Sequence, residues 1–315
     1  MKRLLITGAS GFIGQHFLSL LSESDYEVHA IDLKSLKETY PHVVWHQADL
    51  LNSAQTWELI SRIRPTHLLH LAWITTPGKW ASSPDNLRWV QGGIDLINAF
   101  REYGGKRVVG AGSCAEYDWK YGYCSEDTTP LAPATLYGAC KHALHIVLAA
   151  FAAQTGLSAA WGRIFFVYGP YENSDRLIPY VINSLLKNEL VRCSHGNQIR
   201  DFLYVGDVAQ ALFELLKNEI SGPVNIASGK PIVLKEMIYM IAEKLDRENL
   251  IALGAIPAAE NEPPLLLADV HRLTHEIEWS PRFTLDEGLD LTINWWKNNP
   301  KIYNDSFPKF IKCSE

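Results

Sequence analysis

Short apolar runs alternate with segments of helical periodicity through the first half of the chain. The apolar runs predict strands buried on both faces at 3–7, 27–33, 43–46, 66–71, 106–112 and 158–167. Helical patterns cover 12–21, 84–101 and 134–154, and Pro84 suits the first turn of the second of these. This alternation predicts an α/β fold with a doubly wound parallel sheet and helices on both of its faces.

The alternation breaks after Gly169 and Pro170. Beyond them the patterns predict strands at 200–205 and 224–227, a loop at 254–264, and helices at 177–187, 206–216, 234–245 and 285–297. We therefore expect residues 1–168 to form one domain. Residues 169–315 then form mainly a smaller mixed α/β substrate lobe, interleaved with elements near 200–228 that return to the first sheet.

Composition narrows the class of protein. Of 315 residues, 47% are hydrophobic and 20% charged, with a net charge of -6, which is typical of a globular protein and disfavours nucleic acid or an anionic membrane as partner. Five cysteines without CxxC spacing predict neither a metal site nor a disulfide framework. The apolar start at 4–6 is too short for a signal peptide, and no apolar stretch looks long enough to span a bilayer. We expect a cytoplasmic protein.

The turn after the first predicted strand is rich in glycine. It contributes Gly8, Gly11, Phe12, Ile13 and Gly14 at the point where a helix begins. Glycines let the backbone approach a pyrophosphate, and the N-terminus of the helix offers unpaired N–H groups to the anion. Because a strand precedes the loop and a helix follows it, the segment predicts a dinucleotide site of the Rossmann type.

Asp32 ends the second strand at the spacing expected for a contact with the ribose 2′-hydroxyl. A carboxylate there repels a 2′-phosphate, so NAD is favoured over NADP, although Lys34 and Lys37 could soften that preference. Asp49 and Leu50 either cover the adenine or, equally well, cap the next helix.

Tyr137 and Lys141 lie four residues apart in a predicted helix and so share one face. We expect the ammonium to lower the pKa of the phenol, so that Tyr137 exchanges a proton with a sugar or alcohol oxygen. Lys141 can also hold the nicotinamide ribose. Ser113 follows the strand at 106–112, at the carboxyl edge of the sheet, where its hydroxyl can bind the reacting oxygen.

With these segments in place, the chain resembles an extended short-chain dehydrogenase/reductase of the nucleotide-sugar epimerase/dehydratase branch, from Lys2 to about Trp296. The segments that carry the resemblance are TGASGFIG at 7–14, HLAW at 70–73, the serine segment at 112–117, YGACK at 137–141, YGP at 168–170 and QIRDFLYVGDV at 198–208. The resemblance implies that Leu71, Ala72 and Trp73 lie beside the nicotinamide half of the cofactor.

The resemblance also implies a nucleotide-diphosphate sugar as substrate. Arg200 would then contact the diphosphate, and a guanidinium suits a phosphate, although a salt bridge to a neighbouring carboxylate is the alternative. The other residues expected at the substrate are Thr75, Ser113, Cys114, Arg176 and Asn225, and for Thr75 a simple turn role is equally open.

Departures from the family pattern restrict the chemistry. The 4,6-dehydratases need an acid and a base directly after the catalytic Ser or Thr, where this chain has Cys114 and Ala115. Glu116 comes next and would point elsewhere if the segment is extended. Elimination of water therefore lacks its residues, and Ala115 also replaces the cysteine of enzymes that epimerise carbons 3 and 5.

Aromatic residues replace polar ones around the expected pocket. Phe165 and Phe166 stand where several relatives carry Ser or Asn, and Trp89 replaces a common Asn. Buried packing is the default for most tryptophans, Trp73 included, whereas Trp80 and Trp119 are the candidates to line the substrate cleft.

The remaining set of Ser113, Tyr137 and Lys141 supports one hydride transfer and one proton transfer at C4 of a nucleotide-activated hexose. A 4-ketoreductase making a deoxysugar nucleotide fits best. A 4-epimerase with tightly bound NAD is the alternative, and a cofactor-binding regulator without catalysis is the alternative of another class. Apolar residues around the helices near 84–103 and 134–154 predict a homodimer through a four-helix bundle, as in relatives.

Overall fold

A seven-stranded sheet forms the centre of the computed structural model, which describes residues 2–33, 39–76, 78–259 and 262–300. Its strands are β1 (Lys2–Thr7), β2 (Tyr26–Asp32), β3 (Val44–Gln47), β4 (His67–His70), β5 (Arg107–Ser113), β7 (Ser158–Ile164) and β11 (Gly222–Ile226). They lie in the order β11-β7-β5-β4-β1-β2-β3, and every pair is parallel. The central strands are buried on both faces, as continuous apolar runs require.

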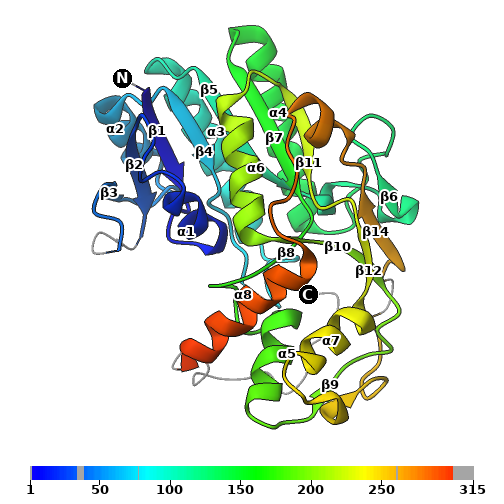
Figure 1. Cartoon of the computed structure of the whole chain (residues 1–315). Helices are drawn as coiled ribbons and strands as arrows, with labels where there is room; N and C mark the ends of the chain where they lie inside the picture. The colour runs from blue at the N-terminus through cyan, green and yellow to red at the C-terminus, as the bar shows by residue number, and fades with distance from the viewer. Residues whose placement is uncertain (1, 34–38, 77, 260–261, 301–315) are drawn as a thin grey trace.

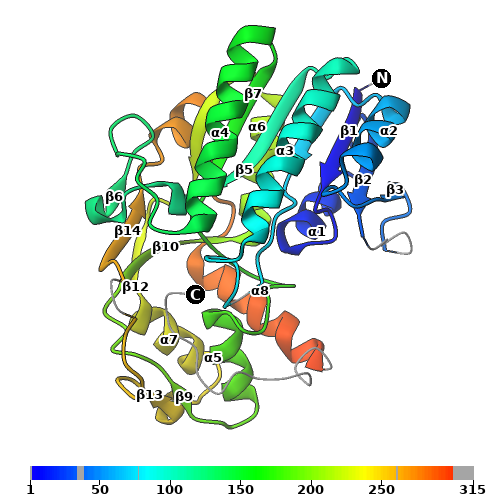
Figure 2. The same ribbon diagram turned by 180° about the vertical axis from the view of Figure 1, so that it is seen from behind.

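Helices cover both faces of this sheet, as Figures 1 and 2 show from opposite sides. One face packs against α1 (Phe12–Ser19) and α6 (Val205–Lys217). The other packs against α2 (Ser53–Ile63), α3 (Asp85–Glu102) and α4 (Leu136–Thr155). The predicted doubly wound α/β fold is therefore confirmed.

A second, mixed sheet and a group of helices lie beyond the carboxyl ends of the parallel strands (Figure 1). The sheet contains β6 (Tyr123–Cys124), β8 (Phe166–Tyr168), β10 (Ile199–Tyr204), β12 (Pro231–Val233) and β14 (Leu265–Ala268). The helices α5 (Leu177–Leu186), α7 (Leu234–Glu243) and α8 (Leu285–Asn298) share one apolar core, with β9 (Val191–Arg192) paired to β13 (Ile251–Ala252) beside them. The smaller mixed lobe is thus present, and α6 and β11 return to the first sheet. The domain boundary at 168/169 stays a prediction.

Four short helical turns complete the described elements: η1 (Cys114–Glu116), η2 (Trp119–Tyr121), η3 (Glu248–Leu250) and η4 (Arg272–Glu276). Most predicted elements lie within a few residues of their observed bounds. The run at 158–167, however, is two strands: β7 joins the main sheet, whereas β8 pairs with β10 in the second sheet. The chain changes sheet at Phe165, so one apolar run serves two sheets.

The expectation that no apolar stretch could span a bilayer was wrong in its literal form. Helix α4 is long and apolar enough by length and composition, and a third of that window is buried in the fold. Core helices of globular proteins meet the same criterion. Here α4 packs on β5, β7 and α3 and buries a charged residue, Lys141.

Candidate active site

A cleft of about 410 Å³ runs between the carboxyl edge of the parallel sheet and the second lobe. Residues predicted to bind the cofactor and residues predicted to bind the substrate both line this cleft. From the cofactor set come Gly8, Gly11, Phe12, Ile13, Gly14, Leu71, Ala72, Trp73, Tyr137 and Lys141, and from the substrate set come Thr75, Ser113, Cys114, Arg176 and Arg200. The open α/β sheet therefore places these residues where ligands bind in folds of this kind.

The glycine loop has no room for side chains. A Cβ on Gly8, whose φ is +68°, would lie 2.8 Å from the Ala72 nitrogen, and one on Gly14 would overlap the carbonyls of Gly8 and Ala9. Helix α1 begins directly after Gly11, with no side chain capping its N-terminal N–H groups. This narrow cradle with free N–H groups fits the pyrophosphate of a dinucleotide.

Asp32 lies beside the same loop. Its Oδ2 accepts hydrogen bonds from the Ser10 backbone N–H at 3.1 Å and from the Ser10 hydroxyl at 2.7 Å. The carboxylate is thereby held at the end of β2, the position from which a ribose diol can be bound. Lys34 and Lys37, which could alter the choice between NAD and NADP, lie outside the described residues.

Three predicted ligand-binding residues are engaged elsewhere. The Asp49 carboxylate accepts from the Leu51 N–H at 2.9 Å, and Leu50 packs in the core under α2 and α3. Asn225 is fully buried in β11, where its side chain accepts from Tyr117 and donates to the carbonyls of Cys124 and Asp269. Like Asp32, none of the three is among the described residues that line the cleft.

The three side chains predicted to be catalytic, Ser113, Tyr137 and Lys141, lie together at the cleft wall. Ser113 ends β5, and its hydroxyl lies close enough to the Tyr137 phenol to oppose the rise in the pKa of that phenol. Lys141 follows one turn later on α4, with its ammonium 2.8 Å from the Ala111 carbonyl and 4.0 Å from the ring centroid of Trp73. The N-terminal part of α4 can approach the serine segment this closely because Gly138 has no side chain; a Cβ there would overlap the Ala115 carbonyl.

Burial sets the protonation of this pair. Desolvation raises the pKa of Tyr137 above its ordinary value, against the smaller opposing effect of the Ser113 hydrogen bond. Desolvation also lowers the pKa of Lys141 to about 7, while the Glu116 carboxylate raises it. The expectation that the ammonium lowers the phenol's pKa is therefore not met here: Lys141 points to Ala111 and Trp73, 5.9 Å from the Tyr137 ring centroid.

Tryptophans lie around the Tyr137 phenol. The Trp80 ring lies edge-to-face on Tyr137, with 4.8 Å between ring centroids, and Trp119 donates its indole N–H to the Cys114 carbonyl at 2.8 Å. Both line the cleft, as expected. Trp73 is buried and stacks on Trp89, so its role combines packing with a face turned to Lys141.

At the far end of the cleft, Arg200 forms the salt bridge that was left open as its alternative. Its guanidinium lies 3.0 Å from the Glu262 carboxylate, and both side chains are only 3% exposed. Gln198 also donates to Glu262, at 2.7 Å, while Arg200 lies over the Phe166 ring. A phosphate at Arg200 therefore has to share the guanidinium with this carboxylate or displace it. Arg176 lies over the Trp80 ring, 5.8 Å from its centroid.

Sequence reasoning missed two acids in the cleft wall, Glu172 and Glu262. Burial raises the pKa of Glu172 to about 8, so this side chain is largely protonated at neutral pH. The YGP segment pointed to the neighbourhood of Glu172, but Glu262 belongs to a loop without any local pattern. Phe165 and Phe166 line the cleft as the aromatic departures suggested.

Comparison with known proteins supports the same reading. Residues 4–227 match the sequence model of the NAD dependent epimerase/dehydratase family. The chain belongs to this family. A putative UDP-glucose 4-epimerase of Methanocaldococcus jannaschii is 29% identical over 308 residues, which cover 94% of this chain and 99% of that protein. UDP-glucuronic acid decarboxylase 1 of Danio rerio is 25% identical over 307 residues, 94% of this chain and 72% of its own length.

Solved structures of similar proteins share the fold of this chain. MoeE5 in complex with UDP-glucuronic acid and NAD superposes with a TM-score of 0.81 at 31% identity, over 94% of this chain and 99% of that chain. UDP-glucose 4-epimerase of Thermotoga maritima shares the fold, with a TM-score of 0.84 at 21% identity over 95% of this chain and 99% of that chain. The family is NAD-dependent and its members act on nucleotide sugars. NAD as cofactor and the family of the chain are confirmed.

Proposed function

We propose that this protein is an NAD(P)-dependent oxidoreductase that acts at C4 of a nucleotide-activated hexose, and that it is a 4-ketoreductase of a deoxysugar nucleotide. When bound, the cofactor supplies the hydride that reduces the keto carbon. Gly8, Gly11 and Gly14 hold its pyrophosphate, Asp32 its adenosine ribose and Lys141 its nicotinamide ribose.

The single observation that carries this proposal is the meeting of Ser113, Tyr137 and Lys141 at one wall of the cleft. The Ser113 hydroxyl binds the C4 oxygen and orients it toward the Tyr137 phenol. Because burial keeps Tyr137 protonated, this side chain is suited to give its proton to the oxygen as a ketone is reduced. Lys141 lies one turn away with its ammonium at the Ala111 carbonyl, a position from which it can hold the nicotinamide ribose.

The residues after the serine support reduction over elimination. Cys114 and Ala115 line the cleft where a dehydratase needs an acid and a base. Cys114–Glu116 is a tight helical turn and not an extended segment, yet it still carries Glu116 into the interior, with no exposed surface. The nearest carboxylate after Ser113 therefore does not face the sugar.

A nucleotide-sugar 4-epimerase is the second candidate, and the relative at 29% identity that carries that name favours it. An epimerase oxidises C4, turns the keto sugar and reduces it from the other face with the same three residues. Cofactor stoichiometry separates the two: a reductase consumes NADH with a 4-keto sugar, and an epimerase interconverts hexoses without net consumption.

A cofactor-binding regulator is the remaining alternative, and the complete Ser, Tyr and Lys set speaks against it. An enzyme loses turnover when Tyr137 becomes phenylalanine while NAD binding persists. A regulator shows no turnover of any nucleotide sugar before or after that change.

We also propose a cytoplasmic homodimer. Helices α3 and α4 lie side by side on the outside of the fold and expose Leu87, Ile94, Ile146 and Val147, which supports a four-helix bundle with a second copy (Figure 2). Of the described cysteines, Cys114, Cys124 and Cys140 are free and buried, in keeping with a reducing compartment; Cys313 lies outside the described residues.

A further inference from the structure

Glu116 is a fully buried carboxylate directly behind the reacting serine. Its Oε1 accepts from the Ser113 backbone N–H at 2.9 Å and from the Trp161 indole N–H at 2.8 Å, and its Oε2 accepts from the Arg163 Nε at 3.1 Å. Strand β5 makes room for this contact at Gly112, where a Cβ would lie 2.6 Å from the Glu116 Oε1. The carboxylate is therefore built into the end of the strand that presents Ser113.

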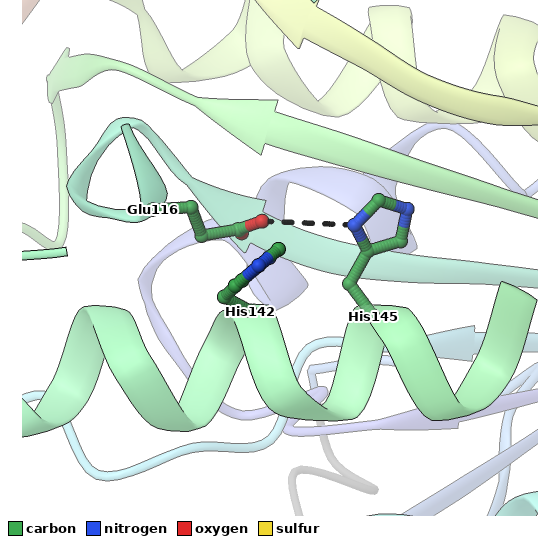
Figure 3. A group of neighbouring side chains, drawn as sticks. All are labelled: Glu116, His142 and His145. Atoms are coloured by element: carbon green, nitrogen blue, oxygen red, sulfur yellow. Dashed lines mark ion pairs between the residues drawn. The ribbon is translucent and has the colours of Figure 1, made fainter. Parts of the chain in front are cut away.

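Two histidines of α4 point at the same carboxylate, as Figure 3 shows. The donor atoms of Glu116, His142 and His145 lie within 4.8 Å of one another, a spacing that a metal ion could use. The Arg163 guanidinium, however, lies 3.1 Å from the Glu116 carboxylate and 3.4 Å from the His145 Nδ1. A permanent cation among the donors opposes a second one, so we interpret the cluster as an ion-pair network.

We propose that Glu116 is a positioning residue for Ser113, Tyr137 and Lys141. Its carboxylate fixes the Ser113 segment, and its negative charge keeps the Lys141 side chain in the ammonium form. This inference rests on the proposed function, because it takes Ser113, Tyr137 and Lys141 as the groups that act on the sugar.

The positioning part follows from the hydrogen bonds. Glu116 closes a capping box with Ser113, whose Oγ accepts the Ala115 N–H at 3.2 Å in return. Arg163 in turn donates to the Tyr117 hydroxyl at 3.0 Å, so three hydrogen bonds from Trp161 and Arg163 tie the turn to strand β7. Because the Ser113 hydroxyl also meets the Tyr137 phenol, a shift of this turn changes the distance between two reacting groups.

The electrostatic part starts from the end of β5, where the Ala111 carbonyl accepts from the Lys141 ammonium at 2.8 Å and the Ser113 N–H, two residues further on, donates to Glu116 at 2.9 Å. The titratable and charged groups that interact with Glu116 are Cys114 from its own turn, Arg163 from β7, and Tyr137, Lys141, His142 and His145 from α4. Burial and the neighbouring Arg163 lower the pKa of His145 to about 3, so His145 is neutral and adds no charge. The Glu116 carboxylate opposes the desolvation that lowers the pKa of Lys141 to about 7. Without that charge, the ammonium gives up its proton at lower pH.

The first test is the isosteric change Glu116→Gln, which keeps an acceptor for Ser113 and removes the charge. Reduction needs the phenol and the ammonium protonated, so activity falls as pH rises through the pKa of Lys141. We expect this alkaline limb to move about one pH unit lower in E116Q. Glu126→Gln is the matched control, because Glu126 accepts the Asn225 N–H at 2.7 Å outside the cleft. We expect the alkaline limb of the pH–activity profile of E126Q to coincide with that of the wild type. An unshifted limb in E116Q overturns the electrostatic part.

A second readout needs neither substrate nor cofactor. The Trp73 ring lies 4.0 Å from the Lys141 ammonium, so its fluorescence changes as that group loses its proton. We expect a transition near pH 7 that is absent in Trp73→Phe and Lys141→Met and moves lower in E116Q. A transition that coincides in wild type and E116Q contradicts the inference. If the transition moves but no nucleotide sugar is turned over by the wild type, the proposed function fails and the role of the Glu116 charge stands.

Glu116→Asp tests the positioning part separately, and it carries the test if E116Q does not fold. Aspartate keeps the charge but is one methylene shorter, so it loses the Ser113 N–H. We expect the fluorescence transition at its wild-type pH, a kcat at least tenfold lower and an unchanged KM. A wild-type kcat in E116D overturns the positioning part.

Discussion

Tyr137 and Lys141 share one wall of the cleft, and burial acts on them in opposite directions. It raises the pKa of the phenol and lowers the pKa of the ammonium to about 7, so both protons are present below neutral pH. The sequence spacing of four residues predicted that the two side chains share a face. It could not predict that Trp73 and the Ala111 carbonyl hold the ammonium, because those contacts come from other elements.

Tyr137→Phe removes only the proton that the sugar oxygen receives. We expect turnover to fall about 10²- to 10⁴-fold, the usual contribution of a positioned acid. The dissociation constant for NADH, measured by fluorescence titration, stays within a factor of about two, since the ring remains. Substantial activity in this variant contradicts the assigned role.

Arg200→Met tests the diphosphate end of the cleft. A hydrogen bond to a charged group contributes about 1.5–3 kcal/mol, so we expect KM for the nucleotide sugar to rise at least about tenfold while NADH affinity is kept. Arg192→Met, an exposed arginine of the same lobe, is the control. An unchanged KM in R200M means that the salt bridge to Glu262 is purely structural.

Arg200 also shows what local sequence cannot supply. Its motif predicted a ligand-facing guanidinium, and it does line the cleft. Its partner Glu262, however, is 62 residues away in a loop without periodicity, so only the fold brings the two together. Asn225 illustrates the opposite error: the resemblance suggested a ligand contact, but the strand places its amide among buried hydrogen-bond partners.

At the scale of elements, the glycine loop between β1 and α1 was predictable because its requirement is local. Gly8→Ala places a methyl group 2.8 Å from the Ala72 nitrogen and strains a φ of +68°. Gly104→Ala has a comparable φ of +92° and open space around it, so it isolates the steric part. We expect G8A to lose NAD binding by calorimetry and G104A to keep it. Equal affinities contradict the cradle.

The sequence predicted the bounds of strands and helices best where burial alone determines them. The continuous apolar runs identified the parallel strands of the main sheet, because strands covered on both faces have no polar side. The division of 158–167 into β7 and β8, and the short strands β6, β12 and β14, were missed. Their pairing depends on partners far along the chain, which periodicity does not record. Helix α2 was expected to follow Asp49 but was given no bounds, and its N-cap is Asn52.

At the scale of the whole molecule, the doubly wound sheet follows from the order of strands and helices along the chain. The proposed homodimer depends instead on the exposed face of α3 and α4. Ile146 on α4 is 52% exposed although it is large and apolar. We expect Ile146→Glu to convert a dimer into a monomer by light scattering at micromolar concentration. Leu190→Glu, at a 48% exposed site on the other lobe, leaves the dimer intact. A wild-type monomer at that concentration contradicts the bundle.

Reduction at C4 is the central claim, and one measurement tests it most directly. The protein is mixed with NADH and, in separate reactions, with nucleotide-activated 4-keto-6-deoxyhexoses of each base, and NADH loss is compared with sugar product by chromatography. We predict one NADH consumed for each sugar reduced, and none with Tyr137→Phe. Interconversion of 4-epimeric nucleotide hexoses without net loss of NADH would contradict the account and assign an epimerase.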